Sequence, residues 1–461
     1  MKQRISRRRF LGSSAALGAG LGILPAGLAR GYTANEKVDV ALVGVCGRGE
    51  WFVNTMPALC NLAAFCDVNE WRTKETYQRF PNAPKFVDFR KMLDVEGKRI
   101  DGVIVATPDN THAVIAMAAI KHGKAVYCEK PLAHDVYEAR ALRDAAAGHK
   151  VVTQKGNQGT SSEALRRCVE LVRAGVLGEI KEVHVWNADG GEGRRELPKE
   201  RPPCPDYLHW DLWLGPAADR PYHPFWLNWH GWRELATGAL GNWGSHTMNL
   251  PFMALRIDAL WQAGESGPAA GAPRKLLRIE SQMSEITRLA FPRWQIIRYH
   301  VPARCDLPAI VVNWYGGAGP GVKARIKEIL DRGKWKNEEE RNVHNFAACY
   351  LRGPQGAILT TGHNMSYRLM PEEQFAKFDG PPKTLPRTPG HEYEWLEAIK
   401  GKTRTMSNFN YSGPLAEFLL LGNVATLFEG PLEYDPIAGK IVNNAAADRA
   451  LRRQYRPGWS L

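Results

Sequence analysis

The sequence lacks several patterns that mark common classes of protein. None of its eight cysteines, at positions 46, 60, 66, 128, 168, 204, 305 and 349, forms a CxxC pair, which argues against a zinc ribbon and a redox dithiol. No basic cluster is interleaved with aromatic residues along one helix, so we expect no nucleic-acid partner. The histidines between positions 209 and 230 match no known ligand spacing, and we expect no metal site.

The composition is that of a globular protein too long for one core. The 461 residues include no long low-complexity tract, and two domains are expected at this length. A net charge of +13 at pH 7 favours mildly anionic partners. Cys46, Cys60, Cys66 and Cys128 fall in or beside expected core elements, so we predict buried free thiols at these positions.

The first thirty residues carry a separate signal. Ser6-Arg7-Arg8-Arg9-Phe10-Leu11 is followed by a weakly apolar, Gly/Ala-rich run to Ala29, which is typical of a twin-arginine export signal. A membrane anchor is the alternative, but the glycines and the proline between Gly12 and Pro25 disfavour a stable spanning helix. We therefore predict a signal peptide over residues 1–30, a periplasmic or extracellular location, and no stable membrane insertion after processing.

A dinucleotide-binding pattern follows. The apolar run Val38–Val43 predicts a strand buried on both faces. A glycine-rich turn, a helix and a second strand, Leu62–Cys66, come next, and that strand ends at Asp67. In this order the turn and the helix N-terminus hold a pyrophosphate, while the acid accepts the ribose hydroxyls. A carboxylate at Asp67 repels the extra phosphate of NADP, so we predict NAD, with NADP disfavoured.

The glycine-rich turn departs from the G-x-G-x-x-G pattern at one position. Its predicted cofactor-binding residues are Gly44, Cys46, Gly47, Arg48 and Gly49. Cys46 stands where the second glycine is expected, at the closest approach to the pyrophosphate. A tight strand–helix turn without any ligand therefore stays open as the alternative.

The stretch Asp101–Pro131 supplies two strand ends that face one crevice. Strands are predicted at Gly102–Ala106 and Ala125–Cys128, with a helix at Thr111–His122 between them. The first strand ends at Thr107-Pro108 and the second at Glu129-Lys130-Pro131. Ligands of open parallel sheets bind beyond the carboxyl ends of the strands. Alternating helices and strands predict a doubly wound parallel sheet over residues 36–155.

This block resembles the Gfo/Idh/MocA family (glucose–fructose oxidoreductase and inositol dehydrogenase). The residues that carry the resemblance are Thr107, Pro108, His112, Gly123, Lys124, Glu129, Lys130, Pro131 and Glu138. The resemblance implies that both turns flank a nicotinamide, that Lys130 touches the cofactor and the substrate hydroxyl, and that the peptide bond before Pro131 is often cis. We assign Thr107, Pro108, His112, Glu129, Lys130, Pro131 and Asn157 to the cofactor site.

The second domain, residues 156–461, is predicted to be α+β. Alternating strands over 180–189, 295–301, 309–314, 347–351 and 357–361 indicate a large, mostly antiparallel sheet with helices on one side. The segment 316–345 is predicted to be a mobile loop over the site or a surface excursion, and 391–399 and 413–429 to be amphipathic helices. Tryptophans concentrate in Trp210–Trp243, mostly for packing, with one or two at a sugar site.

A second chemical centre lies at Asn242 and His246. A helical run places these positions i and i+4 on one face. The family usually has Asp-x-x-x-His here, so the resemblance implies that His246 accepts a proton. Asn242 can orient a hydroxyl but carries no charge. Lys130, Asn242 and His246 are the predicted catalytic residues.

Together these features predict an NAD-dependent oxidoreductase that acts on a secondary hydroxyl of a sugar or cyclitol and retains its cofactor. Exported proteins meet little free NAD, and twin-arginine transport moves folded proteins, which is why retention is expected. A glycosidase or lyase that uses NAD catalytically is one alternative, and a non-catalytic sugar-binding relative is the other. The resemblance also implies a homo-oligomer that pairs through the open face of the second sheet.

Overall fold

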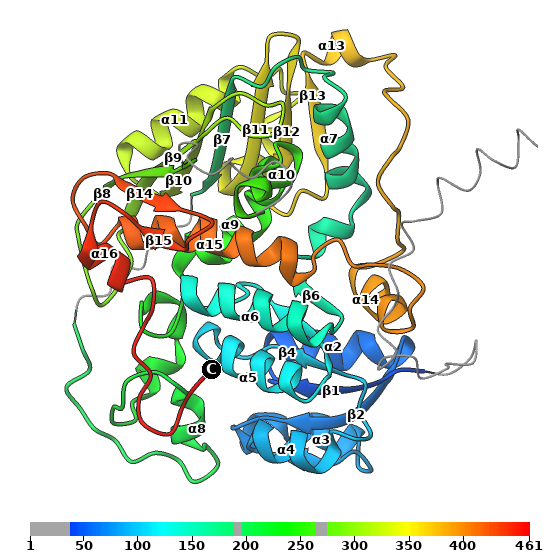
Figure 1. The fold of residues 1–461 in the computed structure, drawn as a ribbon, viewed down its shortest axis with the longest axis vertical. Coiled ribbons are helices and arrows are strands. Elements are labelled where there is room, and N and C mark those ends of the chain that lie inside the picture. The colour runs from blue at the N-terminus through cyan, green and yellow to red at the C-terminus, as the bar shows by residue number, and fades with distance from the viewer. Residues whose placement is uncertain (1–36, 189–195, 263–273) are drawn as a thin grey trace, which may run out of the picture.

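Two β-sheets, one parallel and one mostly antiparallel, organise the chain (Figure 1). The computed structural model describes residues 37–188, 196–262 and 274–461. The export signal predicted at residues 1–30 lies outside the described residues. Among the described helices, none is long and apolar enough to cross a membrane.

The N-terminal sheet has six parallel strands in the order β3-β2-β1-β4-β5-β6, which confirms the predicted Rossmann-type sheet. Its strands are β1 (Asp39–Val43), β2 (Asn61–Cys66), β3 (Lys85–Phe86), β4 (Gly102–Val105), β5 (Ala125–Glu129) and β6 (Thr153–Gly156). The connecting helices are α2 (Arg48–Thr55) with the 3-10 turn η1 (Met56–Ala58), α3 (Glu70–Arg79), α4 (Phe89–Glu96), α5 (Asp109–Lys121) and α6 (Val136–His149). The central strands are short apolar runs because helices cover both faces.

The two faces of this sheet are covered by helices of different origin. Helices α4, α5 and α6 pack on one face. On the other face α2 packs together with α14 (His391–Ile399), which comes from late in the chain. A Cβ added to Gly102 would stand 2.9 Å from the indole of Trp395 in α14. The C-terminal half therefore completes the core of the N-terminal domain.

The second sheet has nine strands in the order β13-β12-β11-β7-β10-β9-β8-β14-β15. The strands are β7 (Glu182–Asn187), β8 (Leu277–Met283), β9 (Trp294–Val301), β10 (Ile310–Gly317), β11 (Ala347–Gly353), β12 (Gly356–Thr361), β13 (Tyr367–Met370), β14 (Leu432–Asp435) and β15 (Lys440–Ile441). Among these neighbours, β7 and β10 pair in parallel and the others are antiparallel. The predicted α+β fold class is confirmed.

Helices α7 (Glu163–Arg173), α9 (Gly238–Thr247), α10 (Asn249–Ala254) and α15 (Phe409–Ala425) cover one face of this sheet. Helix α15 contradicts the amphipathic helix predicted over 413–429. It is buried on every side, because it lies between the second sheet and α6 of the N-terminal domain (Figure 1). Its fully buried Glu417 pairs with Arg140 of α6 at 2.9 Å and accepts hydrogen bonds from Trp261 and Tyr434.

The segment 316–345 is neither a mobile loop nor a surface excursion. It forms α11 (Pro320–Asp331) and most of α12 (Glu338–Phe346). Helix α11 packs Val322, Ile326, Ile329 and Leu330 against side chains on the opposite face of the second sheet, including Trp186 and Tyr315. Its apolar positions recur at helical spacing, which explains why it is bound to the sheet rather than mobile. This part of the sheet face, predicted to be open, is therefore covered.

Short elements complete the described chain. They are η2 (Gln158–Ser161), α8 (Trp210–Leu214), η3 (Pro224–Leu227), η4 (Trp229–Gly231), η5 (Ile257–Trp261), α13 (Glu372–Phe375) and α16 (Ala445–Arg449). Helix α8 and the C-terminus lie beside the N-terminal domain, away from the second sheet (Figure 1). The tryptophan-rich window is thereby brought to the strand ends of the first sheet.

Candidate functional site

A pocket of about 440 Å³ opens at the carboxyl ends of β1, β2, β4 and β5. The predicted site residues that line it are Gly44, Cys46, Gly47, Arg48, Asp67, Thr107, Pro108, His112, Glu129, Lys130 and Asn242. Another part of its wall comes from remote segments: Trp213 of α8, Trp229 of η4 and Trp459 near the C-terminus. The pocket therefore lies where a parallel sheet is expected to bind its ligand.

The glycine-rich turn needs glycine for two different reasons. Gly44 has a φ of +83°, and a Cβ there would stand 2.6 Å from the carbonyl oxygen of Ala106. A Cβ on Gly49 would stand 1.9 Å from the carbonyl oxygen of Gly44, so Gly49 allows the turn to close although it does not line the pocket. Because neither residue has a side chain, the backbones of β1, β4 and α2 can approach each other closely at this turn. The turn can then cradle a phosphate.

The thiol of Cys46 is half-buried in the pocket wall rather than buried in the core, which corrects the expectation for this cysteine. Cys60, Cys66 and Cys128 are buried free thiols, as predicted. Burial, with Asp67 nearby, raises the pKa of Cys46 to about 12. The thiol is therefore uncharged at neutral pH and puts no negative charge beside a pyrophosphate.

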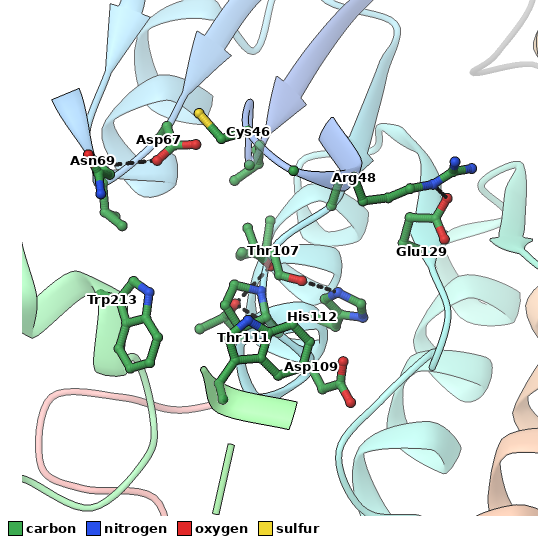
Figure 2. Close-up of a pocket in the computed structure, with 18 of the residues that line it drawn as sticks. Cys46, Arg48, Asp67, Asn69, Thr107, Asp109, Thr111, His112, Glu129 and Trp213 are labelled. Atoms are coloured by element: carbon green, nitrogen blue, oxygen red, sulfur yellow. Dashed lines mark hydrogen bonds and ion pairs between the residues drawn. The ribbon is translucent and has the colours of Figure 1, made fainter. Parts of the chain in front are cut away.

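Asp67 ends β2 with its carboxylate held by the backbone. One oxygen accepts the N–H of Val45 at 2.8 Å. The other accepts the N–H of Asn69 at 2.9 Å (Figure 2). Burial raises the pKa of Asp67, opposed by these backbone hydrogen bonds and by Arg72. Each carboxylate oxygen keeps lone pairs for further donors, which suits the two hydroxyls of a ribose.

Arg48 turns away from the centre of the pocket and pairs with Glu129 (Figure 2). Its Nε lies 2.8 Å from Glu129 Oε1, and Gln158 donates to the same oxygen at 3.0 Å. The Glu129 side chain is buried, and a Cβ on Gly156 would stand 2.6 Å from its carboxyl carbon. Glu129 is thus a fixed anchor at the end of β5 and not a free base.

His112 ties the two predicted turns together. Its Nδ1 lies 2.6 Å from the carbonyl oxygen of Pro131 and its Nε2 lies 2.8 Å from that of Thr107. The peptide bond between Lys130 and Pro131 is cis, as the resemblance implies. Pro131 itself does not line the pocket. His112 therefore sets the spacing of the Thr107 and Lys130 turns.

A buried contact places α9 against the N-terminal domain. Asp109, at the start of α5, accepts the backbone N–H of Thr237 at 3.0 Å and the Thr237 hydroxyl at 2.9 Å. Thr237 directly precedes α9, so this contact orients the helix. The side chain of Asn242 consequently reaches the end of β5, where the Lys130 ammonium donates a hydrogen bond to its Oδ1.

Burial changes the protonation of the predicted catalytic groups. It lowers the pKa of Lys130, although Glu129 and Asp109 act in the opposite direction. Burial also lowers the pKa of His246 well below its usual value, and Lys130 and His363 add to that effect. His246 lies one turn beyond Asn242, is 5% exposed, and is outside the residues that line the described pocket. It is therefore a neutral imidazole at neutral pH.

Asn157 lies outside the pocket. It is buried, and its Oδ1 accepts a hydrogen bond from the hydroxyl of Ser407. Sequence reasoning also missed residues in and around the site. Trp459 gave no signal, because nothing local links the C-terminal tail to the pocket, and neither His363 nor Lys155 belongs to a chemical motif.

The fold and the pocket define the class of protein: a dinucleotide-binding Rossmann domain joined to an α+β domain. Residues 38–157 match the Gfo/Idh/MocA model, described as an oxidoreductase family with an NAD-binding Rossmann fold. The chain is 30% identical to a levoglucosan dehydrogenase of Pseudarthrobacter phenanthrenivorans over 29% of its own length and 35% of that protein. It is 29% identical to a glycosyl hydrolase family 109 protein of Saccharopolyspora erythraea over 38% of its own length and 44% of that protein.

The matched segments therefore cover less than half of these curated relatives. Among solved structures, an inositol dehydrogenase homologue from Azotobacter vinelandii, complexed with NADH and myo-inositol, has a TM-score of 0.55 at 16% identity. That similarity covers 87% of this chain and 98% of the other. At this identity the similarity shows a shared fold over both domains. Residues 38–157 are therefore similar to the NAD-binding Rossmann domain of this oxidoreductase family.

Proposed function

We propose that the protein is an NAD-dependent oxidoreductase that acts on a secondary hydroxyl of a sugar or cyclitol. The observation that carries the proposal is the contact between Lys130, at the end of β5, and Asn242, one turn before His246 on α9. The contact joins a cation to an amide in the pocket wall, and the neutral imidazole of His246 lies one helical turn beyond that amide. The relatives named for levoglucosan and inositol dehydrogenation support this substrate class.

The residues fit a dinucleotide. The turn Gly44–Gly49 would hold the pyrophosphate, Asp67 the adenosine ribose, and the turns at Thr107 and Lys130 the nicotinamide end. When bound, NAD supplies the hydride acceptor. Lys130 stabilises negative charge on the substrate oxygen as its proton leaves, and the neutral His246 imidazole accepts that proton. Asn242 accepts from Lys130 through Oδ1 and leaves its amide N–H groups for a substrate oxygen.

Tight retention of the cofactor is the second part of the proposal, and the C-terminal tail supports it. Arg456 donates to the carbonyl oxygen of Gly215 at 2.6 Å and pairs with Asp211 of α8 at 2.5 Å. These contacts attach the tail to α8, and both segments contribute a tryptophan, Trp213 and Trp459, to the pocket wall. A ligand enclosed by two segments that are bound to each other must wait for local opening before it dissociates.

Export is proposed together with retention. The twin-arginine pattern at residues 6–11 supports a route that carries a folded, cofactor-loaded protein. Replacing Arg7 and Arg8 by Lys should leave the protein inside cells that otherwise release it to the periplasm. Equal export of this variant and of a Lys2→Gln control would refute the assignment.

One experiment tests both the chemistry and the retention. Protein purified from its native compartment is denatured, and released small molecules are identified by absorbance and mass; NAD is expected. The holoenzyme is then mixed with levoglucosan, myo-inositol and common aldoses, and reduction of the bound cofactor is followed at 340 nm. Lys130→Ala should slow this reduction by roughly 10²- to 10⁴-fold with the released NAD unchanged. Protein that neither carries nor binds NAD would contradict the proposal.

A glycosidase or lyase that uses NAD catalytically is the second candidate. The similarity to a glycosyl hydrolase family 109 protein favours it. The intact turn Glu129-Lys130-Pro131 favours the dehydrogenase, since the resemblance implies a different turn in the relatives that cleave glycosides. Release of nitrophenol from nitrophenyl glycosides without net NADH would establish the second candidate.

A further inference from the structure

A second histidine, His363, lies directly against His246. It belongs to the turn between β12 and β13, and the two ring centroids are 4.4 Å apart with an interplanar angle of 56°. His246 is buried, whereas His363 is exposed. Trp243 borders the pair, with its ring centroid 5.0 Å from that of His363. The two histidines therefore form a continuous ring contact from the interior of the site to the surface.

Three hydrogen bonds and one close backbone approach hold the turn of His363 in place. Asn364, which has a φ of +56°, donates through its buried side chain to the carbonyl oxygen of His246 at 2.5 Å. The same side chain accepts from the Thr360 hydroxyl at 2.6 Å, and Ser162 donates to the Asn364 carbonyl at 2.9 Å. A Cβ on Gly159 would stand 2.0 Å from the His363 carbonyl oxygen. His363 is thus fixed to α9 and η2.

The charges around the pair favour movement of a proton outward. Cationic groups from three parts of the fold act on His246, namely Lys130 directly after β5, Lys155 of β6 and Arg48 of α2, the last of which is paired with Glu129. Although the ring of His363 reaches solvent, its partial burial against the protein lowers its pKa, and Lys130 and Arg48 add to that effect. His246 is 5% exposed, whereas the ring of His363 reaches solvent. A proton on His246 is therefore less stable than one on His363.

The Nδ1 atom of His246 is buried and can form a hydrogen bond that the described residues do not supply. Among the described residues, its Nδ1 has no hydrogen-bond partner. A buried polar atom without a partner is unfavourable, so a proton at this position needs an acceptor close by. His363 is the neighbouring group whose ring can supply one and that also reaches solvent.

We propose that His363 is the outer member of a proton relay that passes the substrate proton from His246 to solvent. The relay rests on the proposed dehydrogenase function. In oxidation, bound NAD would accept a hydride from the substrate carbon, while His246 accepts the proton of the substrate hydroxyl, so that a carbonyl forms. The imidazolium of His246 then gives its proton to His363, which releases a proton to water. Both histidines return to the neutral state, and reduction runs the same path in reverse.

The test compares His363→Asn and His363→Gln with the wild-type holoenzyme, using whichever of levoglucosan or myo-inositol it oxidises. In weak buffer, we expect kcat to fall roughly tenfold while KM stays the same. Added imidazole should restore kcat in proportion to its concentration, because it replaces the lost proton acceptor. His122→Asn, a change in a partly exposed histidine at the end of α5, is the matched control and should respond to neither condition. A relay is refuted by unchanged kcat, or by a raised KM without imidazole rescue.

A second measurement needs no substrate. Histidine-labelled protein is titrated by NMR, and His363→Asn should move the titration midpoint of His246 upward, because one neighbouring positive charge is lost. Lys130→Met should move the midpoints of both histidines upward. An unmoved His246 midpoint in His363→Asn would refute the coupling between the rings. A wild-type protein that oxidises no sugar but shows the coupling would instead contradict the proposed function and leave the relay geometry standing.

Discussion

The ammonium of Lys130 donates a hydrogen bond to Oδ1 of Asn242 and thereby joins the turn that follows β5 to the middle of α9. One partner belongs to the parallel sheet and the other to the second domain, so the reacting groups are aligned only when the domains are packed together. The Asp109–Thr237 hydrogen bonds at 2.9 and 3.0 Å hold that packing from the neighbouring strand end. Chemistry in this protein therefore depends on the orientation of its domains.

Replacing Asn242 by Asp adds a negative charge against Lys130. Burial lowers the pKa of Lys130, and a carboxylate partner raises it by about 1 unit or more. If the cation is required, activity is lost as pH rises through the pKa of Lys130. The alkaline limb of the kcat profile should therefore shift upward by about one pH unit in Asn242→Asp. Asn345→Asp, on α12, is the control, and coincident profiles for all three proteins would mean that Lys130 is not the titrating group.

Replacing Asp67 by Ala should relax the choice of cofactor. The carboxylate repels a 2′-phosphate, and Arg72 lines the same part of the pocket. Removal of the Asp67 carboxylate leaves Arg72 free to pair with the 2′-phosphate of NADP. The ratio of the NADP and NAD dissociation constants, measured by fluorescence with stripped protein, should fall at least roughly tenfold. Asp94→Ala, on an exposed side chain, should leave the ratio unchanged; an unchanged ratio in Asp67→Ala would place the ribose elsewhere.

Replacing Arg48 by Met should destabilise the protein through Glu129. The carboxylate of Glu129 is nearly buried, with 4% of its side chain exposed, whereas Arg48 is 38% exposed. Because Arg48 is partly solvated, the cost should be about 1–2 kcal/mol, below that of a fully buried pair. Urea unfolding measures it. The double variant Arg48→Met/Glu129→Gln should recover part of the loss; equal destabilisation in both variants would show that the pair is not coupled.

Replacing Lys155 by Met should stabilise the protein at neutral and acid pH. Lys155 is fully buried, its Nζ has no hydrogen-bond partner among the described residues, and burial lowers its pKa from 10.5 to about 7. Below pH 7 both folded and unfolded chains hold the proton, so the burial cost is fully present. Above pH 7 the folded chain releases the proton first, and wild-type stability climbs until the unfolded chain also releases it near pH 10.5.

At pH 6 the unfolding free energy of Lys155→Met should thus exceed that of the wild type by a few kcal/mol. The pKa of Lys155 falls from 10.5 to about 7 on folding, and each pKa unit corresponds to about 1.4 kcal/mol. The gap should narrow at pH 9 and above. Urea unfolding at pH 6, 8 and 9.5 checks this, with Lys74→Met on the exposed side of α3 as control. A variant that is less stable at pH 6, or a gap independent of pH, would show that Lys155 is not a buried cation.

Local patterns were sufficient for most of the elements around the pocket. Helix α14 (His391–Ile399) has the predicted bounds, and β1, β4 and β5 agree with the predicted strands within two residues. Strand ends, glycine turns and helical spacing are local properties, so the chain shows them without its tertiary contacts. The elements that prediction missed, such as β14 and β15, are short and gain stability mainly from strands far away in the sequence.

The sequence by itself determined the parallel sheet, the glycine turn that leads to Asp67, and the candidate groups Lys130, Asn242 and His246. Tertiary structure decided which residues meet there. Packing placed Asn157 against Ser407 and outside the pocket, brought Trp459 from the C-terminal tail into its wall, and set His363 against His246. The physical reason is the distance along the chain over which each effect acts. The periodicity of apolar residues and the residue preferences of turns act over a few positions. These contacts join residues more than a hundred positions apart, so only the packed domains define them.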